Sequence, residues 1–246
     1  MPRKFPKSFE HEHSTQSIQL RVRSNTKQSY LKDAVYGGID GAGTTFAVVA
    51  GVVGAGLSSQ TIIILGIANL LADGFSMAVG NYMGTSTENQ ELDLIKEFED
   101  HHINEHPEGE VNEVRQILIE QGFEGDLLEE NVSFYTSDRS RWIQFMVQYE
   151  YGLSGNKKSA FKAAWATFIA FAICGSIPLL AYFLSVDSAF LWSSVLTGLA
   201  FALIGSLKSQ WTVESAWIAA AKTFALGAVA SILAYGAGHF VQNFLL

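Results

Sequence analysis

Two aspartates stand inside stretches of the chain that are apolar enough to cross a membrane. Asp40 lies in YGGIDGAGTTFAVVAG and Asp73 lies in ANLLADGFSMAVGNYMG. An ionised carboxylate inside a bilayer is costly, so such residues usually face a cavity, a partner or a substrate path. Both aspartates are therefore candidates for binding a cation.

The second of these stretches also carries other groups that can bind metals. Asp73, Met77 and Asn81 recur at a spacing of four, which places each about 40° round a helix from the last. Carboxylate and amide oxygens are hard ligands, and a thioether favours a transition metal over magnesium or calcium. The sequence therefore predicts a metal site formed by Asp40, Asp73, Met77 and Asn81. The alternative is that Met77 packs in a core and that Asp40 bonds to a neighbouring helix.

A second candidate site lies in an acidic segment. Residues 88–150 contain 17 of the 24 acidic residues and only four basic ones. Three pairs stand at helical spacing: Glu99 with His102, Glu110 with Glu113, and Met146 with Glu150. Neighbouring like charges on a helix are destabilising unless a cation lies between them, and His and Met add nitrogen and sulfur ligands. We predict a metal site here, with a solvated acidic face as the alternative.

Hydropathy predicts an all-α polytopic membrane protein with five transmembrane helices. A span needs about 20 apolar residues, and the expected spans are 34–57, 61–84, 160–184, 188–207 and 215–246. A polar turn with Lys208, Gln210 and Glu214 separates the last two. Between spans two and three we expect a three-helix metal-binding insert. Its helices are 87–104, 108–121 and 126–153, with Pro107 opening the second and Gly122 ending it.

The chain divides by composition into a basic tail, 1–33, two spans, 34–85, the acidic domain, 86–155, and three spans, 156–246. Lys and Arg gather before span one, before span three and after span four. The positive-inside tendency therefore predicts a cytoplasmic amino terminus and a cytoplasmic insert. The tail has no apolar core after its basic residues, so we expect no cleavable signal peptide.

Small residues recur along the first span at Gly37, Gly41, Gly51 and Gly54. Such a pattern is typical of helices that pack closely in membranes. We therefore expect a dimer whose interface includes this span.

Three motifs, GGIDGAGTTFAVVAGVVGAG, ANLLADGFSMAVGNY and MVQYEYGLS, together resemble the vacuolar iron transporter family over nearly everything after Lys32. The resemblance implies a homodimer of five-span subunits, each with a cytoplasmic three-helix domain that binds ferrous or related ions. It also implies export of iron, and often manganese, from the cytosol in exchange for protons. Asp40 and Met77 match the translocation site. The ligands matched in the cytoplasmic domain are Glu99, Glu110, Glu113, Met146 and Glu150.

Two positions depart from the family pattern. Asn81 stands where many members have a glutamate, and His102 stands where a second first-helix glutamate is usual. The first departure removes a charge near the cytoplasmic mouth, and the second replaces an oxygen ligand with a nitrogen ligand. Fe²⁺ and Mn²⁺ are the expected ions, with Zn²⁺ and Co²⁺ left open.

Two other functions compete with metal export for homeostasis. A membrane-bound di-iron carboxylate oxidase uses paired Glu-x-x-His units; Glu99–His102 is one, and Glu10–His13 lies in the tail. A metal sensor without transport would not explain why two aspartates lie inside the membrane.

The sequence contains no Walker-type phosphate loop, and anionic lipid is a simpler binding partner for the basic tail than nucleic acid. We expect no enzyme activity, no resident cofactor and no nucleic acid. The expected membrane is a bacterial-type cell membrane, or the vacuolar membrane in a eukaryote.

Overall fold

The computed structural model describes residues 12–24, 29–209 and 215–244, and the regular structure in them is helical throughout. Five helices in this part are long and apolar enough to cross a membrane. They are α2 (Leu31–Gly54), α3 (Ser59–Glu105), α7 (Ala160–Ser176) with its continuation to Phe183, α9 (Ala189–Ser209) and α10 (Ala216–Phe244). The prediction of an all-α multi-pass membrane protein is confirmed.

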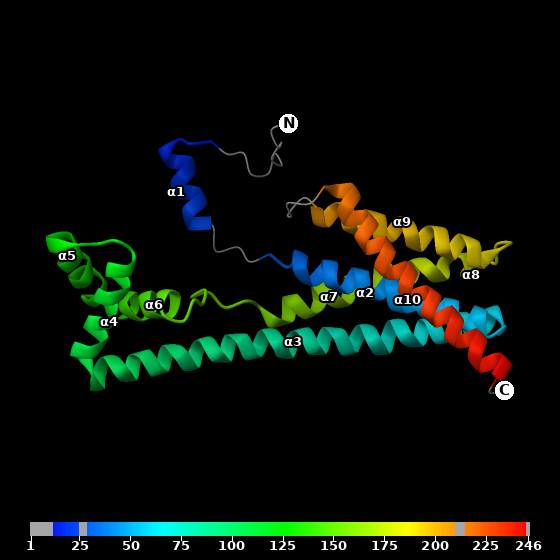
Figure 1. The fold of residues 1–246 in the computed structure, drawn as a ribbon, viewed down its shortest axis with the longest axis horizontal. Helices are drawn as coiled ribbons and strands as arrows, with labels where there is room; N and C mark the ends of the chain where they lie inside the picture. The colour runs from blue at the N-terminus through cyan, green and yellow to red at the C-terminus, as the bar shows by residue number, and fades with distance from the viewer. Residues whose placement is uncertain (1–11, 25–28, 210–214, 245–246) are drawn as a thin grey trace. The chain divides into compact units, whose positions relative to one another are not determined.

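The chain forms two compact units. Residues 1–82 and 160–246 make up the first, called here the membrane unit, and residues 83–159 make up the second, called the acidic unit. Helix α3 contributes to both, and Figure 1 shows it as one uninterrupted helix. The predicted break between a second span and a first insert helix is therefore wrong. The polarity of the chain changes at residues 85–86, but no Pro interrupts the backbone hydrogen bonds there, and Gly84 directly before them remains helical.

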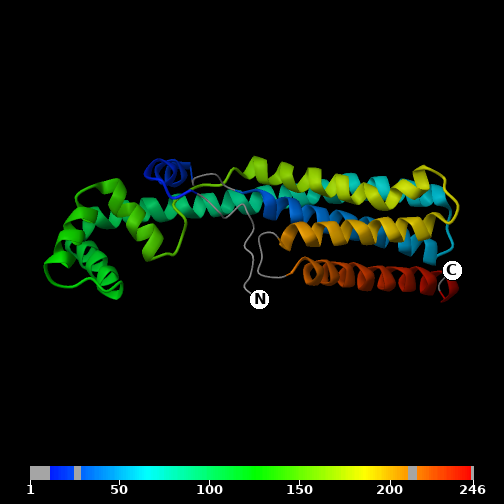
Figure 2. The same cartoon turned by 90° about the horizontal axis from the view of Figure 1, so that it is seen from above.

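In the membrane unit, α2 runs beside α7, α9 and α10 (Figure 2). A methyl group added at Gly37 or Gly41 would collide with the α7 backbone, and one added at Gly54 would collide with the α10 backbone. Small residues let membrane helices approach this closely. These glycines of α2 are thus used for packing inside one chain, and a dimer interface that includes this helix stays a prediction.

The third span changes its helical type near its end. Helix α7 passes into a 3₁₀ turn, η2 (Ile177–Leu179), and then into α8 (Leu180–Phe183). Pro178 has no N–H to donate in the α-helical pattern, which accounts for the tighter turn. Leu179 is fully buried in a cluster with Phe46, Val49 and Ile62, so the turn packs against α2 and α3.

The acidic unit contains the end of α3 followed by α4 (Pro107–Glu120), α5 (Gly125–Thr136) and α6 (Arg139–Tyr149). Pro107 opens α4, and Gly122 follows it with a positive φ of 90°, as predicted. The expected single helix 126–153 is wrong, because Asp138 caps a new helix there. Its carboxylate accepts a hydrogen bond from the Arg141 backbone at 2.8 Å. The buried core consists of Ile103, Val114, Leu118, Val132, Trp142, Phe145 and Met146.

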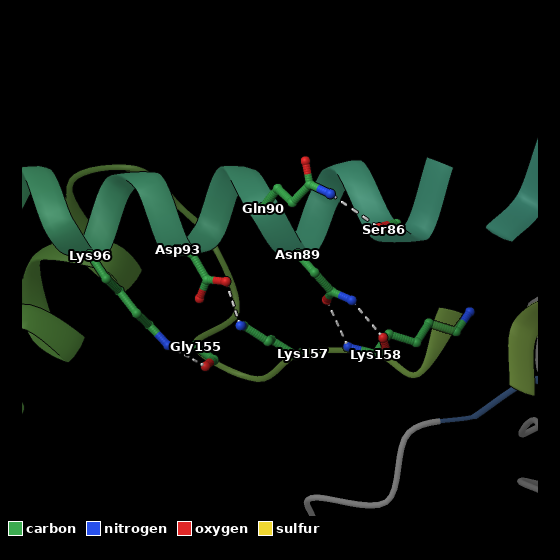
Figure 3. A network of polar contacts seen from close by, with 8 residues as sticks. All are labelled: Ser86, Asn89, Gln90, Asp93, Lys96, Gly155, Lys157 and Lys158. Atoms are coloured by element: carbon green, nitrogen blue, oxygen red, sulfur yellow. Dashed lines mark hydrogen bonds and ion pairs between the residues drawn. The ribbon is translucent and has the colours of Figure 1, made fainter. Parts of the chain in front are cut away.

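The segment that leaves α6 runs back along α3 (Figure 3). Polar contacts join the two at regular intervals. Asn89 bonds both the N–H and the C=O of Lys158, Asp93 pairs with the Lys157 ammonium, and Lys96 donates to the C=O of Gly155. Because the three α3 residues follow one face of the helix, they fix the register of the returning chain. That register holds Glu150 and Tyr151 beside α3.

The basic tail contains a helix that its composition does not predict, α1 (Thr15–Ser24). Glu10, the first residue of the tail's Glu-x-x-His unit, lies outside the described residues, as do Gln210 and Glu214 of the predicted polar turn.

Candidate metal-binding sites

The membrane unit brings the two predicted aspartates together. Asp40 on α2 and Asp73 on α3 are both half-buried, and they are close enough to interact electrostatically. Met77 lies one turn further along α3 and is also half-buried. Two like charges near each other in a membrane are unfavourable unless a cation or protons neutralise them. This pair of carboxylates is therefore suited to binding a cation.

A polar link that the sequence interpretation missed lies one turn from these carboxylates. The Asn69 amide donates hydrogen bonds of 3.3 Å to both Thr44 and Thr45 on α2. Thr44 in turn donates to the backbone C=O of Asp40 at 2.9 Å. Asn69 precedes Asp73 by four residues, so the spacing of the stripe could have identified it. The polar stripe of α3 therefore begins one turn before Asp73.

Asn81 connects three helices of the membrane unit. Its amide nitrogen donates to Asp33 on α2 at 3.0 Å, and to the Thr167 hydroxyl and the Ala163 carbonyl on α7 at 2.7 and 3.2 Å. Asp33 and Thr167 are both buried. The amide nitrogen of Asn81 thus bridges the helices. If Asn81 also binds a metal, which stays a prediction, the ligand is its amide oxygen. The sequence interpretation missed Asp33, whose signal is an acid in the first turn of the first span.

Replacing Asn81 with Ala is expected to destabilise the membrane unit. Buried polar groups that lose a hydrogen-bond donor cost about 1–3 kcal/mol, and Asp33 and Thr167 both lose one. Denaturant titration of the purified protein in detergent micelles measures the effect. Asn243→Ala is the matched control, because Asn243 is exposed on α10 and its amide bonds to His239 of the same helix. Equal stability of the two variants would contradict the bridging role.

The acidic unit buries two of the predicted glutamates. Glu99 is 1% exposed and Glu110 is 3% exposed. Tyr151, which the sequence interpretation did not select, donates a 2.9 Å hydrogen bond to Glu99 Oε1, and His102 Nδ1 lies 3.3 Å from Glu110 Oε1. The second carboxylate oxygen of each glutamate is buried and has no hydrogen-bond partner among the described residues. Leaving such oxygens unpaired is costly, and a bound cation would satisfy both.

The predicted glutamates also influence one another electrostatically. Burial, together with the charges of Glu113 and Glu99, raises the pKa of Glu110 to about 7. Burial likewise raises the pKa of Glu150 to about 7, assisted by Glu99, Glu113 and Glu110. The end of α3, α4 and the end of α6 therefore bring four carboxylates and His102 into one cluster, called here the glutamate cluster: Glu99, His102, Glu110, Glu113 and Glu150.

Met146 occupies a different environment from the glutamates. Its side chain is fully buried in the hydrophobic core with Trp142 and Phe145. In the part of the chain that the structure describes, no three His, Cys, Asp or Glu side chains are already spaced to hold an ion. Binding an ion would therefore have to draw the cluster together. Met146 packs as a core residue here, and its role as a ligand stays a prediction.

The raised pKa values predict that the metal-free protein loses stability as the pH rises. The folded state keeps protons on Glu110 and Glu150 up to about pH 7, whereas the unfolded chain releases them near the ordinary value of 4.5. The folded state thus binds more protons in this window, and its stability falls as the pH increases through it. Thermal unfolding of chelator-treated protein between about pH 5 and pH 7 tests this.

Glu110→Gln should flatten this pH dependence, because the amide cannot titrate. Glu91→Gln, which changes an exposed residue of α3, should leave it as in the wild type. A slope that Glu110→Gln does not alter would contradict the assignment of the raised pKa values.

Comparison with known proteins gives matches over nearly the whole chain. Residues 31–239 match the sequence profile of the VIT family. A vacuolar iron transporter of Toxoplasma gondii is 30% identical over 231 residues, which cover 89% of this chain and 76% of the relative. Vacuolar iron transporter 1 of Eucalyptus grandis is 32% identical over 223 residues, covering 89% of each chain. Vacuolar iron transporter 1 of Arabidopsis thaliana is 31% identical over 221 residues, covering 89% and 88%.

Proposed function

The chain belongs to the VIT family, and on that premise we propose that it carries Fe²⁺, Mn²⁺ or both out of the cytosol across a membrane. Protons move in the opposite direction, and the purpose is metal detoxification and homeostasis. The acidic unit and the amino terminus face the cytosol, and two subunits form a homodimer. The names of the relatives support iron as a substrate.

One observation carries the proposal: two carboxylates from different membrane helices, Asp40 and Asp73, lie close enough to interact, with Met77 one turn away. The thioether is a ligand for transition metals and a poor one for magnesium or calcium. Protons neutralise the carboxylates in the empty site, and an arriving cation displaces them. The protonated empty site and the metal-bound site then both carry little net charge, so the free-energy cost of moving the ion across the bilayer is lower.

The glutamate cluster supports a second step, the capture of ions before they enter the membrane unit. Its buried, unpartnered oxygens on Glu99 and Glu110 accept a cation readily, and the exposed Glu113 and Glu150 give access from water. Capture and translocation therefore use different residues. Substitutions in the glutamate cluster should therefore leave ion binding at Asp40 and Asp73 unchanged, and the reverse should also hold.

The enzyme alternative does not fit this family, whose members are named as transporters. A di-iron oxidase needs paired Glu-x-x-His units. Among the described residues, only Glu99–His102 provides a whole one, since the second begins at Glu10. A sensor without transport would not need Asp40 and Asp73 inside the membrane unit.

Purified protein in sealed vesicles tests the function. With an imposed proton gradient, we expect Fe²⁺ and Mn²⁺ to enter the vesicles while a pH-sensitive dye reports protons leaving. Protein-free vesicles provide the background. Metal entry without proton movement would refute the exchange, and absence of metal entry in either direction of the gradient would refute the transporter.

A further inference from the structure

The histidine of the glutamate cluster lies beside one of its two buried acids. His102 is on the last turn of α3, and its Nδ1 is 3.3 Å from Oε1 of Glu110, which stands in the first turn of α4. The imidazole ring packs against the Phe98 ring with 4.0 Å between the ring centroids. The ring is therefore held at the buried carboxylate while the His102 side chain remains 36% exposed.

An independent observation points to a ligand at this place. Glu110 and Glu99 each have a second carboxylate oxygen that is buried and that no donor contacts within the part of the chain that the structure describes. The first oxygen of Glu99 is already fixed by the Tyr151 hydroxyl. A buried carboxylate oxygen without a partner is unfavourable. An ion held between these oxygens and the imidazole would satisfy both glutamates.

We propose that His102 ligates the captured ion and makes the glutamate cluster prefer Fe²⁺, Co²⁺ and Zn²⁺ over Mn²⁺; this inference rests on the proposed function. An all-oxygen set discriminates weakly among these ions, whereas imidazole suits iron and zinc and carboxylate oxygens suit manganese. Affinity for a site of given ligands also rises from Mn²⁺ through Fe²⁺ to Co²⁺. One nitrogen ligand among four carboxylates therefore shifts the preference away from Mn²⁺.

Two neighbouring histidines provide matched controls. The ring centroids of His101 and His106 are 6.2 and 6.0 Å from that of His102. No ion pair with a buried glutamate is found for either of them among the described residues. If any histidine near the glutamates could set the metal preference, His106→Gln would change that preference as much as His102→Gln does. If the contact with Glu110 decides, only the change at His102 has an effect.

The test uses the full-length purified protein in detergent micelles at neutral pH. All variants carry Asp40→Asn, which removes the intramembrane site from the titration. Bound Mn²⁺ is measured by the loss of the free-ion electron paramagnetic resonance signal, and Co²⁺ is then added as competitor. Pulsed resonance of the bound Mn²⁺ detects a directly coordinated imidazole nitrogen. Size-exclusion profiles establish that each variant is folded.

We expect the preference for Co²⁺ over Mn²⁺ to fall about tenfold in both His102→Glu and His102→Gln. It should stay unchanged in His101→Gln and His106→Gln. The nitrogen signal should disappear with the change at His102 only. An unchanged preference in folded His102→Glu and His102→Gln would overturn the inference and leave the transporter proposal standing. If the wild-type sequence and all variants bound no ion, and no flux occurred in vesicles, both the His102 inference and the transporter proposal would be overturned.

Discussion

Replacing Asp40 with Asn is expected to reduce metal uptake into vesicles to less than about a tenth of the wild-type rate. The amide keeps the volume of the side chain and one oxygen, but it can neither carry a negative charge nor exchange a proton. Asp40 interacts electrostatically with Asp73, so one carboxylate would remain to neutralise a divalent cation. The cost of moving the unbalanced charge into the membrane would then stop transport.

Fe²⁺ and Mn²⁺ uptake, followed together with a pH-sensitive dye, measures this effect. Asp187→Asn is the matched control, because Asp187 is an exposed acid between α8 and α9. Both variants should reconstitute to the level of the wild type. Uptake by Asp40→Asn as fast as that of the control would rule out Asp40 as part of the path.

Changing Glu110, Glu113 and Glu150 to Gln together is expected to weaken ion binding by the acidic unit by about a hundredfold or more. Three of the four carboxylates in the glutamate cluster lose their charge, while side-chain volumes are preserved. In the wild type, the raised pKa values of Glu110 and Glu150 also mean that binding competes with protons. Wild-type affinity should therefore weaken as the pH falls from about 8 to about 6, and the triple variant should show little of this dependence.

Calorimetric titration of the full-length protein, again with Asp40→Asn in every variant, measures the binding. A second triple variant, with Gln at Glu88, Glu91 and Glu97, has the same change in net charge on exposed positions of α3. It should bind ions nearly as the wild type does. Equal weakening in both triple variants would show that only the overall negative charge of the unit attracts ions.

Hydropathy and spacing determined the parts of this protein that depend on local sequence. An apolar run about as long as the bilayer is thick must become a span, so all five spanning helices were predictable. The i, i+4 stripe of α3 was predictable for the same reason, because residues four apart share a helix face whatever surrounds them. The break between α5 and α6 at Asp138 was missed, since a Ser-Asp pair inside an amphipathic pattern competes weakly with helix periodicity.

Tertiary packing alone decided which neighbours each residue meets. The glycines of α2 were available to any close helix, and α7 and α10 of the same chain occupy them. Asn81 carried the signal of a ligand, but Asp33 and Thr167 use its donors. Tyr151 had no signal until the returning segment placed its hydroxyl on Glu99. Such contacts join residues 48 to 86 positions apart, and periodicity along one helix contains no information about the face that another helix presents.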